Sequence, residues 1–246
     1  MSNSPLICYT KISPNKTSLR TQRIDRITPH CVVGQLSAES ICGCFTSPSR
    51  KASCNYGIGS DGRISLCVEE KDRSWCSSSS SNDHRAVTIE CASDKTSPYA
   101  MNSAVYTSLI KLCTDICKRN GKSKLLWFGD KEKTLAYKPK EDEMMITVHR
   151  WFANKSCPGD WLYARLGDLA EKVTKNLKET YYPKYNGISG QVDTVFKAIG
   201  VPNQYIGKWS LRKPIAIAND IDNYVGSAVQ NIKLITLAKQ GKLKKV

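Results

Sequence analysis

The sequence lacks long hydrophobic runs. Nowhere does it approach the roughly 18 consecutive apolar residues that a membrane-spanning helix needs, and residues 1–5 open without a basic segment followed by an apolar one. We therefore expect neither a membrane span nor a secretory signal, and synthesis in the cytoplasm. The 246 residues, 40% of them hydrophobic, suffice for one large domain or two ordinary ones with a packed core.

Acidic residues are also few. Against 37 Lys and Arg stand 22 Asp and Glu, which gives a formal net charge of +15. This excess predicts an anionic partner, which can be nucleic acid, a phosphate-rich polymer or the bacterial wall. The sequence has neither the basic and aromatic signature of RNA-binding modules nor the spacing of zinc fingers. We therefore expect no specific nucleic-acid partner.

Cysteine is absent after Cys157, although eleven cysteines lie between Cys8 and that residue. The uneven distribution indicates two regions of different character. Without an export signal, the expected state of these thiols is reduced. We interpret most of them as small core residues and not as a disulfide framework, and one or two as metal-ligand candidates.

Turn-forming residues mark one boundary. Residues 181–190 contain a proline and two glycines between helical patterns, so we predict a linker there. It separates a domain over 1–180 from a small helical module over 191–246. From residue 171 onward, 13 basic and 5 acidic residues give a net charge of 13 − 5 = +8.

Apolar periodicity indicates an α/β fold. Val105, Leu109, Leu112 and Ile116 form one helical stripe, and Asp160 caps a second predicted helix that runs through residues 162–177. Strands are predicted at 31–33, 55–59, 63–68, 87–91 and 144–149, with a tight turn at 60–62. We read residues 77–81 and 131–143 as surface loops. The expected fold is a mixed central sheet flanked by helices.

Histidine is the scarcest polar residue, with only His30, His84 and His149. We predict that His149 ends a strand, and Cys157 follows it just before Pro158 and a helix start. A catalytic zinc takes three protein ligands and leaves a fourth position open. His149 and Cys157 supply two, and His30 is the best-placed third. His84 follows a serine run, and we expect it to be exposed and not a ligand.

Each of these residues also has a purely structural interpretation. A histidine at a strand end is commonly a hydrogen-bonded structural residue, and a cysteine before Pro-Gly can simply pack in a turn. Widely spaced His, His and Cys are weaker evidence for a metal than paired CxxC motifs. Spacing alone leaves the two interpretations open.

Four segments in order resemble the zinc-dependent N-acetylmuramoyl-L-alanine amidases of type 2, the family of phage lysins and peptidoglycan recognition proteins. Residues 28–34 resemble the first ligand strand and residues 55–64 the hairpin of that family. Residues 73–76, Asn82 and residues 86–90 resemble the rim of the active site and its acidic strand, and residues 149–159 resemble the C-terminal signature. The likeness covers about residues 25–175.

The resemblance implies roles for particular residues. His30, His149 and Cys157 match the three zinc ligands. Glu90 matches the carboxylate that takes a proton from the attacking water, and Lys155 matches a lysine that stabilises the oxyanion. The expected activity is hydrolysis of the amide bond between N-acetylmuramic acid and L-alanine in peptidoglycan, with Zn²⁺ as cofactor, by a phage or prophage endolysin that acts on the wall after release.

One position departs from the family pattern. Cys54 stands where many family members have a tyrosine at the reacting centre, which puts the tyrosine part of the mechanism in doubt. Residues that could line a groove for sugar and peptide are Asn55, Tyr56, Trp75, Arg85 and Trp151. The alternative function is a non-catalytic peptidoglycan-binding protein of the same fold. Cys157 favours the enzyme, because non-catalytic relatives typically have serine there.

The C-terminal module resembles the helical wall-binding repeats of some phage lysozymes at residues 207–209, 212–213 and 229–231. A basic tethered module would raise the concentration of the enzyme at an anionic wall polymer. A helical subdomain that completes the fold or forms an oligomer is the alternative interpretation.

Overall fold

The computed structural model describes residues 3–178 and 181–246, which fall into two compact units, Met1–Leu177 and Lys178–Val246. In the described part of the chain, no helix is long and apolar enough to cross a membrane. Each unit has its own hydrophobic core.

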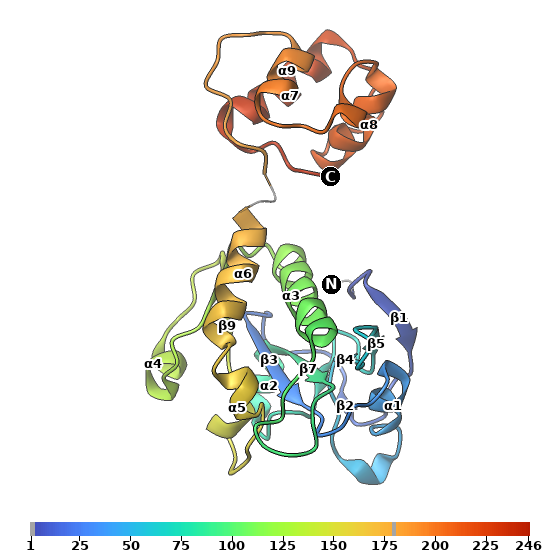
Figure 1. Cartoon of the computed structure of the whole chain (residues 1–246), viewed down its shortest axis with the longest axis vertical. Helices are drawn as coiled ribbons and strands as arrows, with labels where there is room; N and C mark the ends of the chain where they lie inside the picture. The colour runs from blue at the N-terminus through green and yellow to red at the C-terminus, as the bar shows by residue number, and fades with distance from the viewer. Residues whose placement is uncertain (1–2, 179–180) are drawn as a thin grey trace. The chain divides into compact units, whose positions relative to one another are not determined.

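A seven-stranded mixed sheet forms the centre of the first unit (Figure 1), in the order β1-β5-β4-β7-β3-β9-β8. Only β4 and β5 pair antiparallel, and the other neighbours are parallel. The strands are β1 Ile7–Thr10, β3 Arg26–Cys31, β4 Tyr56–Ile58, β5 Ile64–Leu66, β7 Ala86–Cys91, β8 Lys124–Leu126 and β9 Glu143–Ile146. The short strands β2 Lys16–Thr17 and β6 Arg73–Ser74 form a separate pair. The predicted fold class is confirmed.

Two long helices cover one face of this sheet, α3 Ser103–Arg119 and α6 Leu166–Lys178 (Figure 1). Their apolar stripes share one core with alternate residues of the strands, Val87 and Ile89 among them. Helix α1, Ala38–Gly43, covers the opposite face. It approaches so closely that a Cβ atom on Gly57 would lie 2.7 Å from Ile41, so this strand position requires glycine.

The predicted turn at 60–62 joins β4 to β5. Gly62 has a φ of +83°, which glycine adopts without strain, and its N–H donates to Gly59.

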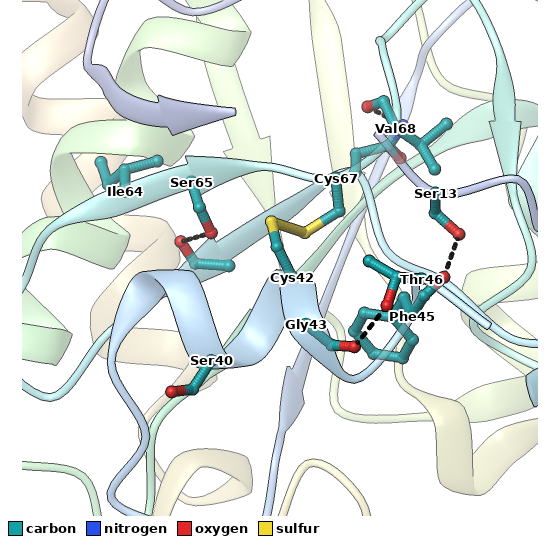
Figure 2. Close-up of a disulfide and its surroundings, with 12 residues drawn as sticks. Ser13, Ser40, Cys42, Gly43, Phe45, Thr46, Ile64, Ser65, Cys67 and Val68 are labelled. Atoms are coloured by element: carbon teal, nitrogen blue, oxygen red, sulfur yellow. Dashed lines mark hydrogen bonds between the residues drawn. A yellow bond between two sulfur atoms is a disulfide. The ribbon is translucent and has the colours of Figure 1, made fainter. Parts of the chain in front are cut away.

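A disulfide joins Cys42 of α1 to Cys67 at the end of β5, as Figure 2 shows, with 5.3 Å between the two Cα atoms. The other nine cysteines are free. The prediction of reduced thiols is therefore wrong for this pair. Sequence spacing could not reveal it, because the two residues meet only when α1 packs on the hairpin.

Several predicted boundaries are also wrong. The strand predicted at 31–33 lies earlier, at β3. Both faces of β3 are covered, so all of its residues are buried, the polar ones included. The strand predicted at 144–149 ends at Ile146, and His149 begins a 3-10 helix, η2 His149–Trp151. The serine run is part loop and part helix, because α2, Ser80–Arg85, starts inside it with Ser79 as its cap.

The region 131–143 is likewise not all loop, since it contains α4, Lys131–Ala136, capped by Asp130. The predicted helix through 162–177 is two helices, α5 Asp160–Tyr163 and α6. Asp160, the predicted cap, is instead the first residue of α5, and Gly159 is the cap. Gly159 has a φ of +84°, a conformation that residues with a side chain rarely adopt. The remaining short element is η1, Pro48–Arg50.

The second unit is helical. It contains α7 Val192–Ala198, η3 Asn203–Tyr205, α8 Trp209–Ala218 and α9 Ala228–Gln240. Ser227 and Gln230 form a reciprocal capping box at the start of α9. Phe196 and Tyr224 are fully or almost fully buried in its core.

Candidate metal centre and active site

The candidate site lies where three adjacent parallel strands end. Ligands of open α/β sheets bind beyond the carboxyl ends of the strands. His30 is the penultimate residue of β3 and Glu90 that of β7, and the two are direct partners in the strand register. β9 lies on the other side of β3, and the chain leaves it to reach His149.

His30, His149 and Cys157 converge. Their ligand atoms all lie within 4.8 Å of one another, and the Cys157 Sγ is 3.1 Å from the His30 Nδ1. Atoms bound at about 2.0 to 2.3 Å to one tetrahedral ion are roughly 3.5 Å apart. The three residues therefore fit a small divalent cation such as zinc with little movement.

The charge state of the two histidines suits metal binding. Burial, and then the neighbouring His149, lower the pKa of His30 to about 3. Burial and the positive charge of Lys155 lower the pKa of His149. Neutral imidazole is the form that binds a metal. The His30 Nε2 is buried and has no hydrogen-bond partner in the described chain, so the protein itself does not satisfy this ring completely.

Cys157 is a thiol in the protein alone. Contact with the Cys31 thiol, and then burial, raise its pKa well above the ordinary value. A thiolate at this place would need a cation for compensation, because the low-dielectric surroundings disfavour a lone negative charge. A divalent ion bound by these residues would provide that compensating charge.

Glu90 lies beside the three candidate ligands. Its Oε1 is 3.9 Å from the His30 Nδ1 and 3.9 Å from the Cys76 Sγ, and its side chain is 14% exposed. Burial raises the pKa of Glu90 to about 7, although Cys76 and Arg50 oppose the shift. The alternative interpretation as a solvent-facing strand residue is wrong, because the side chain points into the site.

A pocket of about 640 Å³ contains this group of residues. Lys155 is exposed at its edge, and Trp75 contributes an aromatic wall. Arg50 and Lys51 also line the pocket, at the end of η1, and in the described chain neither side chain has an ion pair. The pocket lining therefore combines two carboxylates, Asp83 and Glu90, with several cations.

Four of the five predicted substrate-binding residues lie outside the pocket. Asn55 is completely buried and its carboxamide bridges Val68 and Thr88. Tyr56 is also completely buried, and its hydroxyl donates to Glu70 at 2.6 Å. Both side chains are tied to structural partners, so neither can contact a substrate.

Arg85 and Trp151 are structural as well. Arg85 forms a two-point ion pair with Asp25 at 2.6 and 2.8 Å. Trp151 is 8% exposed and stacks on Trp127 with ring centroids 5.1 Å apart. Of the predicted set, only Trp75 lines the pocket.

The third histidine is not part of the site. His84 is half-buried where exposure was expected, and its Nδ1 accepts a hydrogen bond from the Thr21 N–H. Cys54, at the position of the family tyrosine, is fully buried beside Glu90 and does not line the pocket.

Sequence reasoning missed two residues of the site. Cys76 lies near His30 and Glu90, and these three form a second possible ligand group that shares His30 with the first. Ser78 lies 2.8 Å from the His149 Nε2 through its hydroxyl. For Cys76 the available signal was its place at the end of the matched residues 73–76. Ser78 lies in the serine run, whose composition is typical of a surface loop.

Comparison with known proteins gives one family. The family model described as N-acetylmuramoyl-L-alanine amidase matches residues 20–160, more than half of the chain. Among solved structures, PlyL is 14% identical, with a TM-score of 0.48 over 67% of this chain and 95% of that one. An AmpD derivative is 18% identical, with a TM-score of 0.47 over 66% and 93%.

A third structure is the endolysin amidase LysCS from Clostridium intestinale, which is 16% identical with a TM-score of 0.41 over 68% of this chain and 99% of that one. A search of curated proteins gave no match.

Proposed function

We propose, from the premise that this chain belongs to the N-acetylmuramoyl-L-alanine amidase family, that its activity depends on zinc held by His30, His149 and Cys157. The chain is an enzyme of that family, and peptidoglycan is the substrate on which the family acts. The observation that carries the zinc proposal is the convergence of two neutral imidazoles and one thiol, His30 from β3 and the other two from the segment after β9.

Zinc held by these residues would supply Lewis-acid chemistry: it would make a hydroxide-like nucleophile available at neutral pH and would polarise the amide carbonyl. The chain's own residues would hold the metal ion in place and transfer protons. The two imidazoles present nitrogen lone pairs, and Cys157 gives up its thiol proton when it becomes a ligand.

Glu90 is the proposed proton carrier. Its pKa of about 7 lets the carboxylate accept a proton from water at neutral pH and then release it to the leaving nitrogen. The Glu90 Oε2 is buried without a hydrogen-bond partner in the described chain, so this oxygen has a free lone pair for the proton.

Lys155 is the proposed oxyanion partner. Its ammonium group lies at the edge of the pocket, close enough to His149 to lower the pKa of that ring. A cation there would stabilise the negative charge that develops on the carbonyl oxygen, an effect of about 2.7 to 4 kcal/mol for one such donor in other enzymes.

The alternative is a protein of the same fold that binds peptidoglycan without cutting it. It would need the pocket but neither a thiol ligand nor a buried carboxylate. This chain has both, at Cys157 and Glu90, which favours hydrolysis.

For the second unit we propose binding to anionic wall polymers. Residues 181–246 contain 10 Lys and Arg and 3 Asp, a net charge of 10 − 3 = +7, and Trp209 on α8 is 44% exposed. A wall-binding module would raise the local concentration of the catalytic unit at its substrate. Oligomer formation through this unit is the competing proposal, and the sedimentation behaviour of the isolated chain separates the two.

The lytic role is part of the proposal. A phage or prophage endolysin is made inside the host and cuts the wall after release, so protein added to purified wall should act without any further factor. The decisive experiment is mass spectrometry of the released fragments. An amidase frees stem peptides that begin with an L-alanine amine, whereas a muramidase frees disaccharide peptides and an endopeptidase cuts within the stem. Either of the latter products would contradict the proposal.

A further inference from the structure

The segment between β6 and α2 lies directly against the candidate metal centre. Ser78 of this segment places its hydroxyl oxygen 2.8 Å from the Nε2 of His149. Cys76, two residues earlier, lies 3.9 Å from the Glu90 carboxylate through its sulfur. One short stretch of chain thus contacts both a proposed metal ligand and the proposed proton carrier.

Ser78 is held in an unusual backbone conformation. Its φ is +61°, in the left-handed region, where a residue other than glycine costs about 1 kcal/mol. Glycine would adopt this conformation without that cost. Serine at this position is therefore less favourable for the backbone than glycine, but it provides a hydroxyl group that glycine lacks.

The neighbouring residues keep Ser78 in that conformation. The Asp83 carboxylate accepts hydrogen bonds from the backbone N–H groups of Cys76, at 3.0 Å, and Ser77, at 3.2 Å. On the other side, the Ser79 hydroxyl caps α2 by accepting from the Asn82 N–H. Both flanks are anchored, so the backbone of Ser78 has a defined position beside His149.

The hydrogen bond determines which nitrogen of His149 is available. A neutral imidazole has one N–H and one lone pair. With the Ser78 oxygen at Nε2, the other nitrogen, Nδ1, is the free ligand atom. For Nδ1 to carry the lone pair, the proton must sit on Nε2, and the hydroxyl then accepts it. Metal-binding histidines generally donate their second N–H to an oxygen in this way.

We propose that Ser78 is a positioning residue of the metal centre, whose hydroxyl holds the His149 ring in the tautomer and orientation that present Nδ1 to the ion. The inference rests on the proposed function, because it assumes that His149 is a ligand. It adds a residue that acts on the metal through His149.

The test uses the full chain with Ser78→Gly. This variant removes the hydroxyl and relieves the left-handed strain, so the metal-free protein should unfold at an equal or higher urea concentration than the wild type. Zinc affinity, measured by competition with a chromophoric chelator, should fall about 10- to 100-fold. In ¹⁵N spectra of the metal-free protein, the His149 nitrogens should change from one dominant tautomer to a mixture.

Two further variants complete the test. Ser78→Ala keeps the backbone strain and should lose the same zinc affinity, which separates the hydroxyl from the backbone. Ser81→Ala is the matched control, because Ser81 is an exposed serine of the same run that does not line the pocket. It should bind zinc like the wild type.

The outcomes are distinct. Wild-type zinc affinity together with an unchanged His149 tautomer in Ser78→Gly would overturn the positioning role. Failure of the wild type itself to bind one zinc, or wild-type zinc binding by Cys157→Ser, would instead overturn the proposed function. A lower unfolding midpoint of metal-free Ser78→Gly with unchanged zinc affinity would show a purely structural serine, and this too overturns the inference.

Discussion

His30 and Glu90 face each other across two parallel strands, with the His30 Nδ1 3.9 Å from the Glu90 Oε1. Their strand register places a candidate ligand and the candidate proton carrier side by side before any loop contributes. His149 and Cys157 then join from one connected segment beyond β9. The sheet therefore places two of the four residues, and the segment after β9 places the other two.

Cys157→Ser should abolish stoichiometric zinc binding and reduce wall hydrolysis at least about 100-fold, because a neutral hydroxyl is a poor zinc ligand. Metal content by mass spectrometry and turbidity loss of purified wall measure the two effects. Cys8→Ser is the control, since Cys8 is a free, exposed cysteine on β1 and does not line the pocket. Normal hydrolysis by Cys157→Ser would contradict the ligand assignment.

Glu90→Gln should retain zinc and lose activity. The amide matches the size of the carboxyl group but cannot carry the proton, a contribution of about 10²- to 10⁴-fold in general acid–base catalysis. We expect kcat to fall by that factor while zinc stoichiometry stays at the wild-type value. Unchanged kcat would assign the proton transfer to another group.

The stability of the metal-free protein should depend on pH through Glu90. Its folded-state pKa of about 7 lies above the ordinary 4.5, so its stabilising contribution is complete below pH 4.5 and is lost as the pH rises through 7. Glu90→Gln removes this loss. In urea unfolding at pH 8, the metal-free variant should be more stable than the wild type by up to about 3 kcal/mol, with little difference at pH 4.

His30 should change the free energy of unfolding with pH in the opposite direction to Glu90. Its folded-state pKa of about 3 lies below the ordinary 6.5, so its contribution is present above pH 6.5 and is lost as the pH falls toward 3. Metal-free protein should therefore lose stability on both sides of a maximum between about pH 4.5 and 6.5. A flat profile through pH 8 in the wild type would mean that Glu90 is not buried in solution.

Lys155→Ala should lower kcat about 10²- to 10³-fold and leave zinc binding intact, because the ammonium acts on charge that appears only during the reaction. Lys138→Ala provides the comparison, since Lys138 is an exposed lysine that does not line the pocket. Equal kcat values for the two variants would leave Lys155 without a role in the chemistry.

Loss of the Cys42–Cys67 disulfide should destabilise the first unit. The bond closes a segment with a sequence separation of 25 residues. Loop entropy for a segment of that length corresponds to about 3 kcal/mol. Cys42→Ala should lower the urea midpoint of the first unit accordingly, whereas Cys44→Ala, at a free and exposed cysteine next to the same helix, should not.

The sequence predicted the sheet and the convergence of residues better than it predicted side-chain orientation. Val87 and Ile89 alternate with Glu90, and that period alone indicates which side of β7 faces the core. Periodicity cannot say what covers the other side. For Glu90 the covering segment is the one that carries Cys76, and its polar composition resembles a surface loop.

Aromatic and amide residues were the least predictable. Tyr56 and Trp151 have side chains that suit a sugar or a core equally well. Their partners decide between the two, and these lie far away in sequence: Glu70 for Tyr56 and Trp127 for Trp151. Such a choice depends on tertiary contacts and cannot be read from local pattern.

The disulfide of Figure 2 encloses the part of the chain that forms one wall of the pocket, with Phe45, Arg50 and Lys51 between its two cysteines. A reductant added to keep Cys157 free would therefore act in two places at once. It would keep the proposed thiol ligand reduced, and it would also remove the crosslink around the segment that lines one side of the pocket. Choice of buffer is thus part of the enzymology of this protein, and specific activities measured with and without reductant should be compared at equal zinc occupancy.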